Sequence, residues 1–157
     1  MFLEIERRFL VREDYIPSDP CGGVRMRAAY LLAGRGLTIR VRIENDRAGV
    51  TFKQRNSALE RAEFEYPVPL EDAEYMMSHF PLAGSIVEKT RYREIVDGRE
   101  WSVDLFSGDN APLRIAEIEL SAADAVFRIP EWAAEEITGD DGYSNAALAL
   151  KPYRFRT

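Results

Sequence analysis

The segment at the start of the chain alternates charged and apolar side chains. Glu4, Glu6 and Arg8 occupy every second position, with Ile5 between the carboxylates and Phe9 after the arginine. Because successive side chains of a β-strand point to opposite faces, this spacing places two carboxylates and a guanidinium on one face. Carboxylates this close repel each other unless a cation or a basic group lies between them. The segment therefore predicts a strand with one strongly charged face.

Eight segments have the alternation, or the β-branched and aromatic content, that is typical of strands. They span residues 2–11, 24–32, 37–44, 49–55, 61–69, 86–96, 100–106 and 113–120. Short turn signals such as Asp97-Gly98 separate several of them, and connections this short join antiparallel neighbours. The segments predict a mainly β member of the α+β class. A closed eight-stranded antiparallel barrel, which has no exposed edges, is one architecture, and a two-sheet sandwich is the other.

Three helices are expected beside the strands. Acidic Glu71 and Asp72 favour the start of one helix over residues 69–80. Pro130 can open a second over 130–137, and Ser144 can cap a third over 144–150. No composition shift or linker divides the chain, so a single domain over residues 1–157 is expected.

Composition limits where such a protein works and what it binds. The net charge of -6 disfavours nucleic acid and anionic membranes as partners. No apolar run approaches the roughly 20 residues of a membrane span, and no signal peptide precedes the first charges. The single cysteine, Cys21, fits a reducing compartment. The sequence predicts a cytoplasmic protein and is compatible with a homodimer.

The charged faces of the later segments allow two interpretations. The polar sets at period two are Thr38, Arg40 and Arg42; Thr51, Lys53 and Arg55; Arg61, Glu63 and Glu65; Lys89, Arg91 and Arg93; Ser102 and Asp104; and Glu117 and Glu119. These faces either lie in solvent, as charged sheet faces commonly do, or line the interior of a barrel. Interior charges would need a ligand that compensates both signs. A phosphate chain with a divalent metal does so, because basic groups bind phosphate oxygens and carboxylates bind Mg²⁺ or Mn²⁺.

Several segments, in this order, resemble one known family. They are Glu4-Ile5-Glu6-Arg7-Arg8-Phe9-Leu10-Val11, Val41-Arg42-Ile43, Thr51-Phe52-Lys53, Glu63-Phe64-Glu65-Tyr66, Glu88-Lys89-Thr90-Arg91-Tyr92, Val103-Asp104, Ala116-Glu117-Ile118-Glu119-Leu120, Tyr143-Ser144-Asn145 and Lys151-Pro152-Tyr153. The first is similar to the ExExK signature of the CYTH superfamily, also called triphosphate tunnel metalloenzymes. The resemblance covers nearly the whole chain and is closest to bacterial tripolyphosphatases.

The resemblance implies an eight-stranded barrel whose interior hydrolyses a triphosphate with Mg²⁺ or Mn²⁺. Inorganic tripolyphosphate is the first expected substrate, and a nucleoside or thiamine triphosphate the second. It implies phosphate binding by Arg8, Arg40, Arg42, Lys53, Lys89 and Arg91; metal binding or orientation by Glu4, Glu6, Asp104, Glu117 and Glu119; and catalytic roles for Arg8, Tyr30, Glu63 and Glu65.

Arg8 departs from the family signature, which has lysine at this position. In the bacterial tripolyphosphatases that lysine, paired with a tyrosine like Tyr30, is thought to orient or activate water. Arginine stays protonated and cannot act as a base, although it still binds phosphate. A polyphosphate-binding module with little or no turnover is therefore an alternative to the enzyme, and an adenylyl cyclase is a second alternative.

Overall fold

The computed structural model describes residues 5–55 and 61–157, without the side chains of Arg55 and Arg61. The strands are β1 (Ile5–Val11), β2 (Val24–Ala33), β3 (Leu37–Glu44), β4 (Arg47–Arg55), β5 (Arg61–Val68), β6 (Val87–Val96), β7 (Arg99–Ser107), β8 (Arg114–Leu120) and β9 (Ala133–Glu136). They form one antiparallel sheet in the order β5-β4-β3-β2-β6-β7-β8-β1-β9. The mainly β architecture is confirmed, and eight of the strands coincide with the predicted segments.

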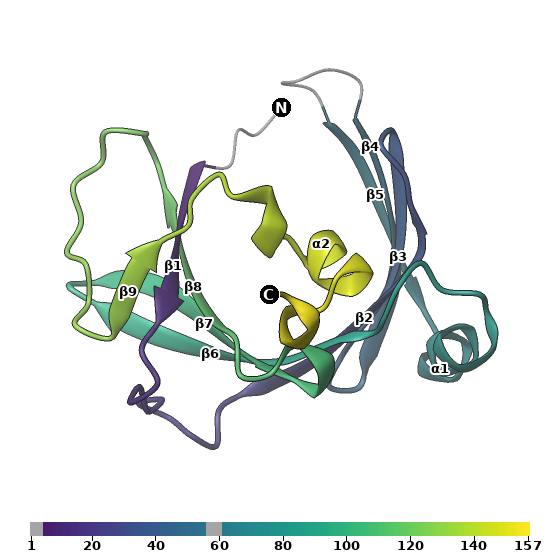
Figure 1. Ribbon diagram of the computed structural model, residues 1–157, viewed down its shortest axis with the longest axis horizontal. Helices are drawn as coiled ribbons and strands as arrows, with labels where there is room; N and C mark the ends of the chain where they lie inside the picture. The colour runs from purple at the N-terminus through teal and green to yellow at the C-terminus, as the bar shows by residue number, and fades with distance from the viewer. Residues whose placement is uncertain (1–4, 56–60) are drawn as a thin grey trace.

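The sheet is strongly curved but open. Figure 1 shows a trough in which β3–β5 form one wall and β1, β8 and β9 form the other. Within the described residues, no hydrogen-bonded ladder joins β5 to β9, so the two edges are not closed into the predicted barrel. The result is a tunnel-like trough with an open side.

The helices lie at two places on this sheet. They are α1 (Leu70–His79) and α2 (Asn145–Leu150), with short 3₁₀ turns η1 (Gly108–Asn110), η2 (Asp141–Tyr143) and η3 (Tyr153–Phe155). The Ser144 side chain caps α2 by accepting a hydrogen bond from the Ala147 amide, as its position predicted. Asp97 and Gly98 have positive φ angles of 49° and 73°, which the predicted two-residue turn between β6 and β7 requires.

The prediction of a helix over residues 130–137 is wrong. Ala133–Glu136 instead forms β9, which pairs with β1 through Phe9–Glu136 and Val11–Ala133. The edge of β1 offers unpaired backbone groups, and pairing them outweighs the helix propensity of this short segment. An ion pair between Arg7 and Glu136 joins the same two strands.

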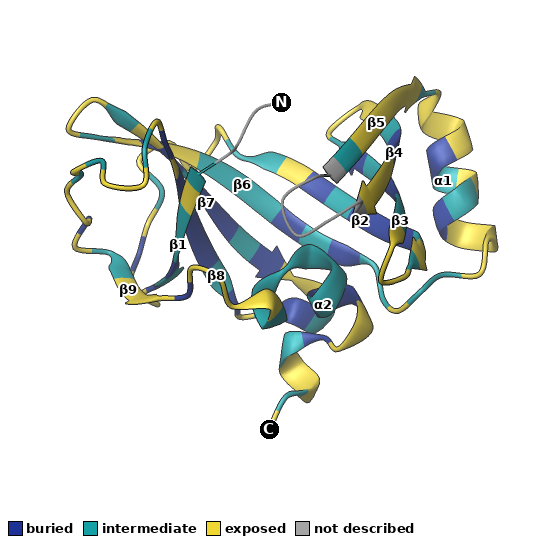
Figure 2. Cartoon of the chain, turned by 90° about the horizontal axis from the view of Figure 1, so that it is seen from above, coloured by how far each residue is buried: buried dark blue, intermediate teal, exposed yellow. Residues whose placement is uncertain are grey.

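The convex face of the sheet is apolar and covered. Helix α1 packs on β3 and β4 through Ala73 and Met77, which share one apolar cluster with Val41 and Ile43. Figure 2 shows this helix outside the β3–β5 wall. On the other side, Trp101 lies at the centre of a second cluster that the segment with Phe127 and Trp132 covers. These two layers occupy the apolar strand faces and leave the charged faces to the concave side.

A third apolar cluster closes one end of the trough. Tyr30, Val87, Phe106 and Ile115 lie at this end of β2, β6, β7 and β8, and α2 packs on them through Leu148 and Ala149. Figures 1 and 2 both show α2 at the end of the sheet. No helix in the described parts of the chain is long and apolar enough to cross a membrane.

Candidate functional site on the concave face

Strand register brings the charged side chains together on the concave face. Thr38 lies opposite Lys53, which lies opposite Glu63, and Arg40 is opposite Thr51, which is opposite Glu65. The floor of the trough, between its two walls, includes β6 and β7, where Arg91 lies opposite Asp104. Glu117 lies opposite both Arg8 and Ser102. Arg40 and Lys89 are each only 9% exposed, so these cations lie inside the trough and not on a solvated face.

Asp104 forms the centre of a buried charge cluster on β6 and β7. It is 2% exposed, and it accepts hydrogen bonds from Lys89 Nζ at 2.6 Å and from Arg91 Nε and Nη2 at 2.7 and 2.9 Å. Burial acts to raise the pKa of Asp104, but the charge of Lys89 and the hydrogen bonds of Arg91 outweigh it and lower the pKa. Both carboxylate oxygens are therefore held by cations, which the aspartate in turn positions.

Burial acts to lower the pKa of both cations of the cluster, whereas it acts to raise the pKa of Asp104. It lowers the pKa of Lys89, which the charge of Asp104 offsets only in part. The hydrogen bonds to Asp104 raise the pKa of Arg91, which stays protonated. Two basic groups share one carboxylate here, so the cluster carries surplus positive charge that an anion can use.

Three carboxylates line the wall that contains β1 and β8, which faces the β3–β5 wall. Glu6 lies directly opposite Glu119 in the register, and Glu117 is two residues away on the same face. Glu117 and Glu119 also line a cavity of about 510 Å³ together with Arg91 and Ser102. We call Glu6, Glu117 and Glu119 the acidic wall. It supplies the hard oxygen donors that Mg²⁺ and Mn²⁺ prefer.

Arg8 joins the acidic wall to the C-terminal segment. Its Nε lies 3.1 Å from Glu117 Oε1, and its Nη2 donates to the backbone carbonyl of Tyr143 at 3.1 Å. The Arg8 backbone amide also donates to Thr138 Oγ1 at 2.9 Å. Although both residues are described, no hydrogen bond joins Arg8 to Tyr30. The side chain is therefore a protonated bridge between β8 and the residues that precede α2.

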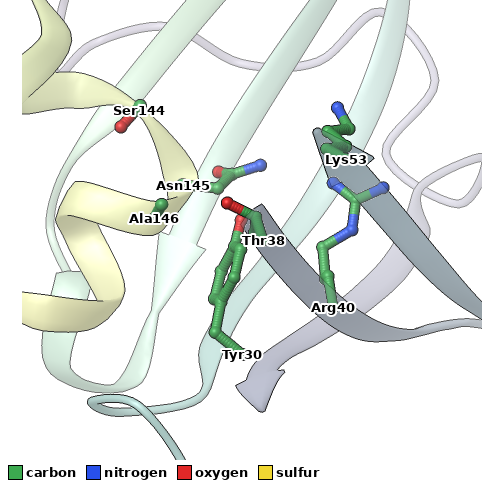
Figure 3. Close-up of a pocket in the computed structure, with 7 residues that line it drawn as sticks. All are labelled: Tyr30, Thr38, Arg40, Lys53, Ser144, Asn145 and Ala146. Atoms are coloured by element: carbon green, nitrogen blue, oxygen red, sulfur yellow. The ribbon is translucent and has the colours of Figure 1, made fainter. Parts of the chain in front are cut away.

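A separate pocket lies between α2 and the β3–β4 wall. It has a volume of about 270 Å³ and is lined by Tyr30, Thr38, Arg40, Lys53, Ser144, Asn145 and Ala146. We call it the cationic pocket, because its lining has two basic groups and no carboxylate. In Figure 3 the Asn145 side chain extends from α2 toward β3, and Arg40 and Lys53 lie side by side on the other side.

Two polar groups of this pocket are buried. Arg40 Nε has no hydrogen-bond partner among the described residues, and its Nη2 reaches Thr51 only at 3.4 Å. Burial raises the pKa of Tyr30, and the neighbouring Arg40 lowers it only in part, so the hydroxyl stays protonated and can donate. An incompletely satisfied buried guanidinium favours an anionic ligand.

The margins of the site hold Arg42, Glu63 and Glu65, and Lys53 joins the cationic pocket to them. Arg42 pairs with Glu44 at 2.9 Å and with Glu65 at 3.6 Å, while Lys53 lies 3.6 Å from Glu63. Glu63 and Glu65 are exposed on edge strand β5. Glu4 lies outside the described residues.

The roles predicted from the sequence did not include Thr38, Ser144 and Asn145. Thr38 shares the face of Arg40, and the period-two pattern alone could have included it. Ser144 and Asn145 belong to the Tyr143-Ser144-Asn145 segment of the resemblance. No local sequence pattern, however, predicts that they share a pocket with residues of β3 and β4. Only the packing of α2 against the end of the trough places them in the pocket.

The acidic wall suits a divalent metal that takes some of its ligands from these carboxylates and the others from the substrate and water. In the described residues, no group of three or more acidic, histidine or cysteine side chains is arranged to enclose an ion. Mg²⁺, however, is commonly held by one or two carboxylates, with water and substrate phosphates as its other ligands. The opposed pair Glu6–Glu119 offers two carboxylates of that kind. Both oxygens of Asp104 are bound to Lys89 and Arg91.

The resemblance implied an eight-stranded antiparallel barrel with a charged interior, and the structure has an open antiparallel trough with a charged concave face. The CYTH domain family matches residues 3–149, and the chain belongs to this family. It is 37% identical over 151 residues to an inorganic triphosphatase of Acetivibrio thermocellus, with 96% of each chain covered. It is 34% identical to an inorganic triphosphatase of Nitrosomonas europaea, covering 94% of this chain and 97% of that one.

A solved structure shares the fold closely. The crystal structure of an inorganic triphosphatase superposes with a TM-score of 0.77 at 33% identity, and 96% of each chain is covered. The sequence resemblance to the CYTH superfamily is thereby confirmed.

Proposed function

We propose that this protein hydrolyses inorganic triphosphate with a divalent metal, Mg²⁺ or Mn²⁺, inside the trough. Membership of the CYTH domain family and likeness over almost the whole chain to two inorganic triphosphatases support a triphosphate hydrolase. The observation that carries the proposal is that one concave face gathers cations of β3, β4 and β6 together with carboxylates of β1 and β8. A phosphate chain with a bound metal needs both.

The cations bind and orient the phosphate chain. Arg40 and Lys53 of the cationic pocket would hold one end, while Lys89 and Arg91, both fixed by Asp104, would hold the phosphates over the floor. We assign Asp104 the positioning of these two cations in place of direct metal binding. Fixed donors of this kind stabilise charge in a transition state without reorganisation, which supplies much of the rate in phosphoryl transfer.

The acidic wall would hold the metal. Glu6 and Glu119 would supply its protein ligands, and Glu117 is held by Arg8 and, at 3.9 Å, by Arg91. A bound divalent ion would neutralise phosphate oxygens and activate the attacking water. Arg8 stays charged and therefore orients Glu117 and phosphate without removing a proton. Glu63 and Glu65 on β5 remain the candidates for positioning water on the open side.

A panel of substrates and metals tests this function. We expect phosphate release from tripolyphosphate with Mg²⁺ or Mn²⁺, slower release from ATP and thiamine triphosphate, and none in EDTA. Tight metal-dependent binding of tripolyphosphate without release would instead support a binding module. Formation of cyclic AMP from ATP as the main reaction would support a cyclase. Either result would refute the proposed function.

A further inference from the structure

We propose that Asn145 is a specificity-determining residue that contacts the last phosphate of the substrate and limits the length of the phosphate chain. The inference deepens the proposed function and rests on it, since it concerns which polyphosphate the same trough accepts. The residue lies at the first position of α2, at the closed end of the trough.

The end of the trough is held shut by several independent contacts. Leu148 and Ala149 are fully buried against the strand ends. The Ser85 amide donates to the carbonyl of Ala149 at 2.8 Å, and the side chain of buried Asn110 reaches the carbonyl of Leu148 at 3.4 Å. These contacts anchor α2 to the segments before β6 and after β7, so we expect the helix to end the path of a chain that enters the cationic pocket.

The charges in the trough give a bound phosphate chain a direction. All carboxylates of the acidic wall lie on β1 and β8, whereas the cationic pocket has only neutral and basic lining residues. A metal-bound part of the substrate therefore belongs beside Glu119, and a metal-free terminal phosphate belongs beside Arg40 and Lys53. Such a terminus carries the highest charge of the chain and suits a pocket whose lining has two basic groups and no carboxylate, with Glu63 3.6 Å from Lys53 beside it.

Asn145 has the chemistry and the position to meet that terminus. Its half-buried side chain extends into the pocket and makes no hydrogen bond with any residue of the described chain. A free amide offers two N–H donors, which suit phosphate oxygens, and it adds no charge. Across the pocket, Arg40 Nε likewise has no partner within the described residues. One phosphate between them would satisfy both groups.

The Arg8 bridge ties the segment before Asn145 to the acidic wall. Arg8 Nη2 donates to the carbonyl of Tyr143, two residues before Asn145, while Arg8 Nε contacts Glu117. The position of the stop is thus coupled to the acidic wall, and the distance between them is built into the fold. A fixed distance between metal site and chain stop selects one chain length.

Chain-length kinetics test the proposal. The wild-type protein should prefer tripolyphosphate to tetrapolyphosphate by about tenfold in kcat/KM, as is common when one group too many meets a closed pocket. Asn145→Ala should reduce that preference severalfold, because the smaller side chain leaves room for a further phosphate in front of α2. Asn145→Asp should raise KM for tripolyphosphate by about tenfold or more, with a smaller change in kcat, because a carboxylate of the same size repels the terminal phosphate.

The matched control is Gln54→Glu, which makes the same amide-to-carboxylate change on an exposed residue of β4. Gln54 alternates with Lys53 and therefore faces away from the trough. It should leave KM and chain-length preference unchanged. An unchanged preference in Asn145→Ala, or an unchanged KM in Asn145→Asp, overturns the inference, as does equal wild-type turnover of both chains.

Binding measured by calorimetry in EDTA separates this inference from the proposed function. If no substrate is hydrolysed but metal-free protein prefers tripolyphosphate, and Asn145→Ala loses the preference, the proposed function fails and the role of Asn145 stands. If tripolyphosphate is hydrolysed but Asn145→Ala keeps the wild-type preference in both assays, only the role of Asn145 fails.

Discussion

Asp104 shows how a single residue organises the concave face. It is almost inaccessible to solvent, and it holds Lys89 and Arg91 through three hydrogen bonds. Removing the charge from one partner of a buried ion pair is costly because the other partner is left uncompensated. The aspartate therefore contributes to stability as well as to the placement of the two cations.

Asp104→Asn should destabilise the protein and weaken hydrolysis together. The neutral amide leaves buried Lys89 beside half-buried Arg91 without a compensating charge, and we expect a loss of about 3 kcal/mol in the free energy of unfolding, measured with urea. Asp109→Asn is the matched control, since Asp109 pairs with Arg154 at the surface. Its loss should stay below about 1 kcal/mol. Equal effects of the two substitutions would contradict the role given to Asp104.

Glu94 makes the stability of the protein depend on acid pH. It is 8% exposed and accepts hydrogen bonds from the Tyr15 hydroxyl at 2.6 Å and the Ser18 amide at 2.8 Å. Burial acts to raise the pKa of Glu94, but these hydrogen bonds lower it below its ordinary value. A carboxylate with a lowered pKa stabilises the fold above its unfolded pKa, near 4.3, and this contribution is lost as pH falls through the folded pKa.

Urea unfolding of the wild type and of Glu94→Gln tests this pH dependence. The wild-type free energy of unfolding should fall as pH decreases below about 4, and the fall should be smaller in Glu94→Gln. Parallel pH profiles for the two proteins would show that Glu94 does not carry the effect.

At the scale of elements, α2 connects stability with the site. It is short, so its formation depends on the Ser144 cap and on the burial of Leu148 and Ala149. The same helix carries Asn145 into the cationic pocket. A change that frays α2 should therefore affect both the fold and the site.

Ser144→Ala should lower the free energy of unfolding by about 1 kcal/mol, because the Ala147 amide loses its acceptor. The control is Ser78→Ala on α1, whose hydroxyl donates to the carbonyl of Glu74 four residues earlier on an exposed surface. That change should stay within about 0.5 kcal/mol. Thermal or urea unfolding of both variants makes the comparison, and equal stabilities would contradict the capping role.

The strands could be predicted because their alternation is local. The period-two pattern identified β3 and β6 and put Arg40 and Lys89 on their charged faces. Ala133–Glu136 was not identified, because a four-residue alanine-glutamate segment has helical propensity and becomes a strand only beside β1. One of the two partners of the Arg8 side chain was not predictable either, because it is the backbone carbonyl of Tyr143, which no side-chain pattern reveals.

At the scale of the whole molecule, the apolar and charged faces of one sheet are separated by its curvature. The convex face is packed under α1 on one side and under the segment with Trp132 on the other. The concave face keeps the cations and carboxylates close, and α2 closes one end. Charges of both signs held inside a trough require a ligand of both signs, which a triphosphate with a divalent metal provides.

Two arginine substitutions test whether the concave face is the site of triphosphate hydrolysis. Arg40→Met removes a guanidinium from the cationic pocket, and Arg25→Met removes one from the exposed convex side of β2. With Mg²⁺ or Mn²⁺ and tripolyphosphate, we predict that Arg40→Met lowers kcat/KM by about 100-fold, while Arg25→Met leaves it unchanged. Wild-type turnover in a folded Arg40→Met protein, or an equal loss in both variants, would show that hydrolysis does not depend on the cations of the concave face.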